Sequence, residues 1–390
     1  QQITPISCWR KVALRDALGQ VLHKDVISPL SVPPHANSAM DGYALRGKDL
    51  QNLSISLKLI GSAFAGRPFD KSVNAGECVR IMTGAMMPDG CDTVIMQEQA
   101  EVHDDLITLH GEHHAGENVR LAGEDIQAGA VVLRAGHRII PADLGLLASL
   151  GLAEVSVRRR IRVAFFSTGD ELRSVGEALS PGDIYDSNRY TLYAMLKRLD
   201  AEIIDMGVVT DTPDAIRTAL VEATREADVV ITSGGVSVGE ADYVKQLLEE
   251  LGEVNFWKIA MKPGRPLAYG KITDTHFFGL PGNPVSVMVT FYQFVQPALN
   301  KLAGAINQAP LILQAIAAEK IRKRPGRFEF QRGFLRNNND NQLEVTMTGE
   351  QGSGILHSMS HANCFILLDE DCDGIAPGQS VTVQPFAGLI

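Results

Sequence analysis

The stretch RVAFFST, residues 162–168, opens the part of the sequence that decides the fold. Two more apolar runs of strand length follow it, EIIDMGVV at 202–209 and DVVITS at 228–233. Amphipathic segments lie between and after these runs, and we expect helices over 187–199, 213–225 and 241–251. Apolar strands that alternate with helices are typical of right-handed βαβ units, so this region is predicted to form a parallel sheet. Ligands of such sheets bind beyond the carboxyl ends of the strands.

The sequence on either side of this region has a different pattern. Residues 12–23 place apolar side chains at near-helical spacing, which predicts a helix there. Short β-like runs separated by Gly, Pro and Asp fill about 50–132, and β alternation returns from Pro310 onward. The expected fold class is therefore multidomain α/β plus β. It comprises a parallel-sheet α/β domain, a β-rich domain inserted in the N-terminal half, and a small C-terminal β-barrel or sandwich.

Length and composition limit the classes of protein to which the sequence can belong. Its 390 residues correspond to about two to three domains. An aromatic share of 6% and a net charge of -10 argue against a nucleic-acid partner. No stretch offers the ~20 apolar residues of a membrane helix, and the start QQITPISCWRK lacks the apolar part of a signal peptide. Five cysteines without a CxxC pair suit a reducing compartment, so a cytoplasmic location without membrane contact is predicted.

Two polar turns directly follow predicted strands. Ser167–Glu171 combines hydroxyls, a glycine and two carboxylates, which suit a phosphate or a hydrated metal but also serve to cap helices. In Ser233–Asp242 (SGGVSVGEAD), paired glycines let backbone amides approach an anion. Asp242 there can cap a helix or hold a cation. This turn lacks the lysine of a P-loop and the spacing of a dinucleotide fingerprint, which disfavours ATP-hydrolase and dehydrogenase functions.

Two further turns carry cations and prolines. Residues 257–266 (WKIAMKPGRP) place Lys258, Lys262 and Arg265 beside a stiff Pro-Gly-x-Pro turn, which indicates a recess for an anion or a solvated basic edge. Residues 280–286 (LPGNPVS) join a strand to a helix that starts at Pro284, as a rigid cradle or as turn architecture alone. The histidines of HGEHH and the pair His357 and His361 lack the pattern of a zinc site.

Seven motifs in order resemble those of the molybdopterin molybdenumtransferases, the molybdate-insertion enzymes of molybdenum cofactor synthesis. They are NSAMDGYA, RIMTGA, GED, STGDEL, GGVSVGEAD, KPGRP and LPGNPVS, and the likeness, shared with the C-terminal domain of gephyrin, covers essentially the whole chain. The resemblance implies an elongated homodimer of four-domain subunits with composite active sites. The domains it implies are a linking domain (1–30 with 130–158), a β-rich inserted domain (31–129), an α/β molybdopterin-binding domain (159–307) and a C-terminal β domain (308–390).

The resemblance also implies a reaction and its residues. Adenylylated molybdopterin is cleaved with Mg²⁺ as cofactor, AMP leaves, and molybdate, a substrate, is transferred to the dithiolene; contact with the pterin adenylyltransferase is a further expectation. The catalytic residues implied are Asp41, Thr83, Asp125, Glu171 and Asp242, with Glu171 and Asp242 as metal ligands. The substrate-binding residues expected are Ser167, Thr168, Gly169, Asp170, Asp211, Gly234, Gly235, Ser237, Lys258, Lys262, Arg265, Pro281, Gly282, Asn283 and Pro284.

Physical reasoning agrees with this assignment. A pterin diphosphate adduct is strongly anionic, so carboxylate-rich turns would repel it unless Mg²⁺ screened the charges. Two departures from the family pattern occur: Arg265 stands where lysine is usual, and the family's leading helix is absent before QQITPIS, so part of the first domain is expected to be missing.

Three alternatives can be compared with this assignment. The pterin adenylyltransferase has a similar α/β domain with a TGGTG turn, and a nucleotide pyrophosphatase or deamidase of the competence-damage type has GGLGPTxDD. The turn SGGVSVGEAD disfavours both. A pterin- or nucleotide-binding scaffold without insertase activity is the third, and a test of binding to adenylylated pterin would separate it from the enzyme.

Overall fold

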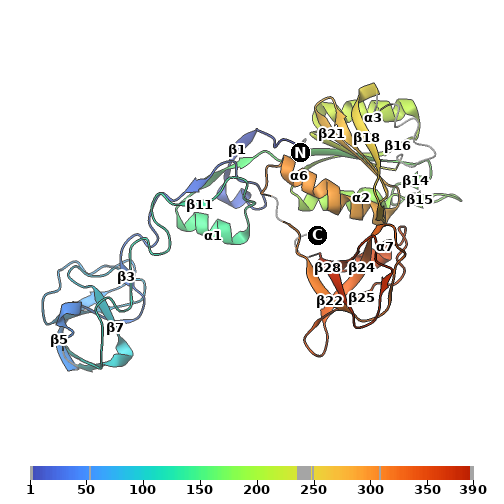
Figure 1. Cartoon of the computed structure of the whole chain (residues 1–390). Coiled ribbons are helices and arrows are strands. Elements are labelled where there is room, and N and C mark those ends of the chain that lie inside the picture. The colour runs from blue at the N-terminus through green and yellow to red at the C-terminus, as the bar shows by residue number, and fades with distance from the viewer. Residues whose placement is uncertain (1–2, 52–53, 235–246, 248–249, 307–308, 387–390) are drawn as a thin grey trace.

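The computed structural model describes residues 3–51, 54–234, 247, 250–306 and 309–386. Figure 1 shows an elongated chain with a β-rich module at one end, which contains β3 (Asn37–Ser38), β5 (Ser54–Ala63) and β7 (Thr93–Met96). A linking module with α1 (Pro141–Ser149) follows, and the α/β and C-terminal modules lie together at the other end.

The linking module is built from two distant parts of the chain. β1 (Trp9–Ala13) pairs antiparallel with β12 (Glu154–Arg158), and β2 (Val26–Ile27) pairs with β11 (Val131–Leu133). The helix predicted over 12–23 is wrong, because β1 is followed only by the 3-10 turn η1 (Leu14–Asp16). Gly19 then has φ +77°, which no right-handed helix allows. The backbone pairing with β12 overrides the local apolar spacing.

The β-rich module contains the runs that sequence alternation predicts. Its six-stranded sheet has the order β7-β4-β6-β5-β9-β8. Its remaining strands are β4 (Gly42–Leu45), β6 (Glu77–Ile81), β8 (Ala100–His103) and β9 (Leu106–His110). The short 3-10 helices η2 (Gly47–Asp49) and η3 (Gln97–Gln99) lie between strands, and β3 pairs with β10 (Val119–Arg120).

The α/β module confirms the predicted parallel sheet and adds an antiparallel edge. Four strands are parallel, in the order β16 (Glu202–Val209), β13 (Arg162–Thr168), β17 (Val229–Ser233) and β21 (Thr275–Leu280). β20 (Pro266–Ile272) and β18 (Gly252–Lys258) extend the sheet in antiparallel orientation. A small flap made by β14 (Leu172–Arg173) and β15 (Ile184–Tyr185) follows β13.

Helices cover both faces of this sheet. The predicted helices appear as α2 (Ser187–Arg198) and α3 (Pro213–Glu226), whereas most of the one expected over 241–251 falls outside the described residues. α5 (Pro284–Thr290), the π-helical turn η4 (Phe291–Val295) and α6 (Gln296–Leu302) complete the module. Phe165 packs in the core on the α2 and α5 side, and Phe166 packs in the core on the α3 side. Burial on both faces explains why the strands are continuous apolar runs.

The C-terminal module is a closed barrel, which decides between the barrel and the sandwich expected from the sequence. Five strands follow the order β24-β25-β22-β28-β26, and pairing of β26 with β24 closes the ring. They are β22 (Leu313–Ala317), β24 (Phe328–Asn337), β25 (Leu343–Met347), β26 (Cys364–Leu368) and β28 (Ser380–Pro385). β23 (Ile321–Arg322), β27 (Gly374–Ile375) and α7 (Leu356–Ser360) fill the connections. β19 (Met261–Lys262), from the α/β module, pairs in parallel with β24.

The cysteines are all free thiols. Burial raises the pKa of Cys78, Cys91 and Cys364 to about 12, so these thiols stay protonated and unreactive at neutral pH. Over the described part of the chain, no helix combines the length and the apolar character needed to cross a membrane.

Candidate functional site

A large polar cavity lies where the parallel strands end. It has a volume of about 1060 Å³, at the upper limit of the size range of sites for small organic ligands. Its walls come from the turns after β13, β17 and β21, from the Met261–Pro266 turn, and from two parts of the barrel, Arg327 and Gln351–Gly354. The site therefore has the position that an open α/β sheet favours, and the C-terminal module supplies one wall.

The floor of this cavity is rigid. Asn188, in the first turn of α2, donates from Nδ2 to Ser233 Oγ (2.9 Å) and to Gly282 O (2.6 Å), which joins two of the strand-end turns. Gly234 has φ +90°, and a Cβ atom there would lie 2.5 Å from Thr168 O. Only glycine allows the turns after β13 and β17 to approach this closely, which explains its place in the motif.

Carboxylates line the cavity near one edge of the sheet. Glu171 and Asp211 come from the turns after β13 and β16, which are neighbours at that edge. Thr168 Oγ1 and Asp186 Oδ2 are buried and have no hydrogen-bond partner among the described residues. The other carboxylate oxygen of Asp186 accepts from Arg189 N (3.1 Å) and caps α2. Hard oxygen donors of this kind are the ligands that a magnesium ion prefers. The described residues hold no cluster of three or more His, Cys, Asp or Glu side chains close enough to bind a metal ion, and Asp242 lies outside them.

Cations line the cavity toward the other edge of the sheet and on the barrel. Lys262 ends β19, Arg265 directly precedes β20, and Arg327 directly precedes β24. Arg265 and Arg327 each end a Pro-Gly-Arg tripeptide, at 263–265 and 325–327. The Lys262 ammonium lies 3.3 Å from Glu329 Oε1. A cavity with carboxylates on one side and cations on the other can bind an anionic ligand together with a metal ion.

The barrel wall is held in place by a buried arginine. Arg332 is 1% exposed and donates to Gly352 O (2.9 Å), Glu350 O (3.3 Å) and Ser358 Oγ (3.0 Å). The Gln351–Gly354 loop also accepts a hydrogen bond at Ser353 O from Val285 N (3.0 Å), which joins the loop to the start of α5. Sequence reasoning missed this wall. The second Pro-Gly-Arg tripeptide and the glycines of GEQGSG were the available signals.

The structure brings most of the sequence-predicted site residues together. Those that line the cavity are Thr168, Gly169, Glu171, Asp211, Gly234, Lys262, Arg265, Pro281, Gly282, Asn283 and Pro284. Ser167 is buried behind the wall, at 1% exposure, while Asp170 and Lys258 are exposed residues outside the lining of this cavity. Gly235, Ser237 and Asp242 lie outside the described residues.

Three predicted catalytic residues lie in other modules. Asp41 follows β3 in the β-rich module, which lies at the opposite end of the molecule from the α/β module and is called the distal module below (Figure 1). Its Oδ1 accepts from Thr83 N and Thr83 Oγ1, each at 2.7 Å. These two hydrogen bonds lower the pKa of the Asp41 carboxyl below its ordinary value. Asp125 lies between β10 and β11, where its backbone N donates to Val32 O (3.0 Å). None of the three lines the cavity of the same chain.

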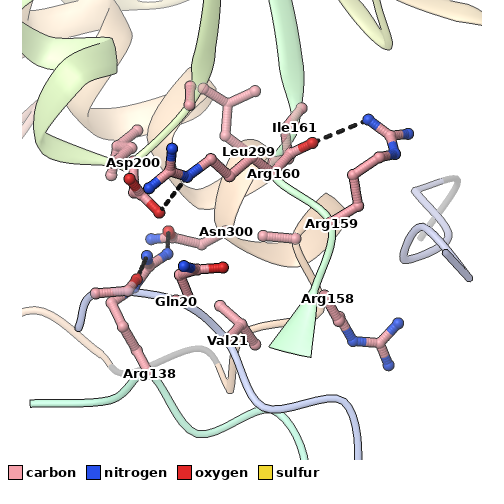
Figure 2. A pocket seen from close by; sticks show the side chains of 14 residues that line it. Gln20, Val21, Arg138, Arg158, Arg159, Arg160, Ile161, Asp200, Leu299 and Asn300 are labelled. Carbon is pink, nitrogen blue, oxygen red and sulfur yellow. Dashed lines mark hydrogen bonds and ion pairs between the residues drawn. The ribbon is translucent and has the colours of Figure 1, made fainter. Parts of the chain in front are cut away.

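A second cavity, of about 30 Å³, lies where the linking module meets the α/β module (Figure 2). Four arginines line it, but each has a protein partner. Arg138 donates to Gly19 O (2.7 Å) and Asn300 Oδ1 (3.1 Å), and Arg158 donates to Ile6 O. Arg159 pairs with Asp228 and Arg160 pairs with Asp200, each at 2.9 Å. These contacts make the cavity a joint between modules with room for little more than water.

Comparison with known families assigns the modules. The MoeA N-terminal region (domain I and II) matches residues 1–151, and the MoeA C-terminal region (domain IV) matches 314–386. Between them, a probable molybdopterin binding domain matches 164–301, the segment that carries the strand-end turns of the large cavity. The fold and these matches define the class as a multidomain protein of the MoeA type.

Individual relatives agree over nearly the full length. The molybdopterin molybdenumtransferase of Haemophilus influenzae is 48% identical over 97% of this chain and 94% of its own, and that of Nostoc sp. is 37% identical over 95% and 87%. The crystal structure of a molybdopterin biosynthesis moeA protein from Pyrococcus horikoshii superposes with a TM-score of 0.86 at 31% identity, over 98% of this chain and 96% of the other. The chain belongs to the molybdopterin molybdenumtransferases, a family of transferases in molybdenum cofactor biosynthesis.

Proposed function

We propose that this protein inserts molybdate into adenylylated molybdopterin, with magnesium-dependent release of AMP. The observation that carries the proposal is the polarity of the large cavity, which has Glu171 and Asp211 on one side and Lys262, Arg265 and Arg327 on the other. The adduct contains a diphosphate, and molybdate is an oxyanion, so both require cations and hydrogen-bond donors. We assign them to the cationic side.

One lip of the cavity suits the planar rings of the adduct. The β14–β15 flap lines it with Leu172, Ile184 and Tyr185. Tyr185 is the one aromatic residue among the described lining residues. Its side chain is held at the far end because Tyr185 Oη donates to Glu177 O (2.9 Å), while the residue stays 44% exposed. An exposed and anchored ring is a stacking platform for a purine or a pterin.

The oxygen-rich side is where we place the magnesium ion. Glu171 and Asp211, with the unpartnered Thr168 hydroxyl and the predicted ligand Asp242, would hold it. The ion would supply positive charge to the phosphoryl oxygens. The chain's own part is then to bind and orient: Lys262, Arg265 and Arg327 hold the oxyanions, and the Gln351–Gly354 loop covers the cavity on the barrel side.

A dimer completes the proposal. Asp41 and Thr83 form one hydrogen-bonded unit in the distal module, far along the chain from the cavity (Figure 1). We propose that the molecule is a homodimer in which this unit acts at the cavity of the partner subunit. The cytoplasmic location and the contact with the pterin adenylyltransferase stay predictions from the sequence.

The direct test is AMP release. Purified protein is incubated with adenylylated molybdopterin, and AMP is quantified with molybdate and Mg²⁺ present together, each alone, or neither. We expect full release only with both. Binding of the adduct without AMP release under every condition would support the scaffold alternative and overturn the enzymatic proposal.

A further inference from the structure

An ion pair between two modules sits at the cationic side of the cavity. Lys262 Nζ lies 3.3 Å from Glu329 Oε1 and 3.4 Å from Glu329 Oε2. The Lys262 side chain is 47% exposed, whereas that of Glu329 is 6% exposed. A buried carboxylate is thus paired with a half-exposed lysine that lines the cavity.

Backbone pairing sets this contact. Lys262 of β19 stands directly opposite Glu329 of β24 in the parallel ladder, and Phe328 N donates to Ala260 O (3.0 Å) beside it. Gln331 Nε2 donates to Glu329 Oε2 (3.1 Å) and to Arg322 O (2.8 Å), which orients the carboxylate. The carboxylate therefore has a defined place, and the flexible lysine takes its position from it.

A buried carboxylate lowers the stability of the fold unless it is paired with a cation and hydrogen-bonded. Arg265 and Arg327, the other cations of the cavity wall, form no ion pair among the described residues. Of these three cations, Lys262 is the one that an acid of the described barrel holds, at the place where the two modules meet.

We infer that Glu329 is a positioning residue for Lys262. It holds the ammonium where the incoming oxyanion is to be bound, and it orders a side chain that otherwise has many rotamers. This inference rests on the proposed function for its activity readout, but not for its structural one.

The main variant is Glu329→Gln, which keeps size and hydrogen-bonding capacity but removes the charge. We expect turnover, measured as AMP release, to fall about tenfold. A change of this size lies within the range of interaction energies between residues in contact. The apparent KM for molybdate should change by less than about threefold, because loss of a nearby negative charge offsets the looser lysine. In the Lys262→Ala background, Glu329→Gln should change turnover by less than about twofold.

Glu344→Gln is the matched control. Glu344 stands opposite Arg336 in the β24–β25 ladder of the same barrel, and the two side chains lie 3.3 Å apart, away from the cavity. This variant should keep wild-type turnover. If Glu329→Gln loses the barrel fold, Glu329→Asp keeps the buried charge with a shorter reach and should show the same loss and the same dependence on Lys262.

A second readout does not need activity. The ¹⁵N ammonium signal of Lys262, assigned by its absence in Lys262→Ala, should report an ordered group in the wild type and in Glu344→Gln, and a mobile one in Glu329→Gln. The inference would be overturned if the Lys262 ammonium were equally ordered in all three proteins. It would also be overturned if Glu329→Gln lowered turnover equally with and without Lys262. An inactive wild type with an ordered Lys262 would instead contradict only the proposed function.

Discussion

At the scale of single residues, the hydrogen bonds from Thr83 affect the titration of the Asp41 carboxyl group. Two hydrogen bonds to one carboxylate oxygen favour the ionised form, so the pKa of Asp41 lies below its ordinary value. The stability that this pair contributes is complete above the unfolded-state pKa, about 4, and is lost as pH falls through the lowered folded-state value.

Removing the hydroxyl should reverse part of this shift. Thr83→Val keeps the backbone donor and removes Oγ1, so the pKa of Asp41 should rise toward its ordinary value. Thr83→Ser keeps both donors and is the control, with the low pKa retained. Carboxyl ¹³C NMR between pH 2 and 6 (roughly two units either side of the ordinary value) measures the titration. An Asp41 midpoint that is the same in Thr83→Val and wild type would show that the hydroxyl does not matter.

Tyr185 allows a second residue-scale test. Stacking of a base on an aromatic ring contributes ~1–3 kcal/mol, so Tyr185→Ala should weaken AMP binding roughly tenfold. Tyr185→Phe keeps the ring and loses only the hydrogen bond to Glu177 O, so its affinity should stay within about threefold of wild type. Calorimetric titration with AMP gives both constants. Equal affinity of the alanine variant and wild type would remove the flap from the ring-binding site.

At the scale of elements, strand β24 positions the wall that the barrel contributes to the cavity. It carries Glu329, which pairs with Lys262, and Arg332, which holds the Gln351–Gly354 loop. Burial lowers the pKa of Arg332 to about 10, so the guanidinium stays charged at neutral pH and depends on the carbonyls it binds.

Arg332→Met should release the loop. The change removes the hydrogen bonds that the guanidinium donates to Gly352 O and Glu350 O, and a hydrogen bond to a charged group contributes about 1.5–3 kcal/mol. We expect faster hydrogen exchange in the segment from Gln351 to Ser358, with little change in the α/β sheet. Arg336→Met, on the same strand with a 58% exposed side chain, serves as the control and should leave this exchange unchanged. Unaltered exchange in Arg332→Met would contradict the anchoring role.

At the scale of the whole molecule, the separation of Asp41 from the cavity predicts complementation between subunits. Mixed dimers of Asp41→Ala with Lys262→Ala should contain one site with both lesions and one with neither. The intact site should restore up to about half of wild-type turnover, the share expected for one of two independent sites.

Two affinity tags allow the mixed dimer to be purified and assayed for AMP release. Each mutant homodimer serves as the reference. Turnover in the mixed dimer no higher than in either homodimer would show that Asp41 acts within its own subunit or not at all.

Much of the α/β module and of its cavity could be predicted from local sequence. Strands buried on both faces must be apolar throughout, and parallel strands must end at one edge, so RVAFFST and DVVITS place Thr168 and Gly234 at the same site. The amphipathic patterns of α2 and α3 are equally local. Apolar alternation likewise predicted the strands of the distal module and of the barrel.

Tertiary structure alone decided the rest, because those features depend on contacts between distant residues. Lys262 and Glu329 are 67 positions apart, and only the β19–β24 ladder brings them together. Pairing of β1 with β12 made a strand of a segment whose apolar spacing indicates a helix. The pattern of a segment reports which side chains avoid water, whereas the partner that excludes the water is chosen by the fold as a whole.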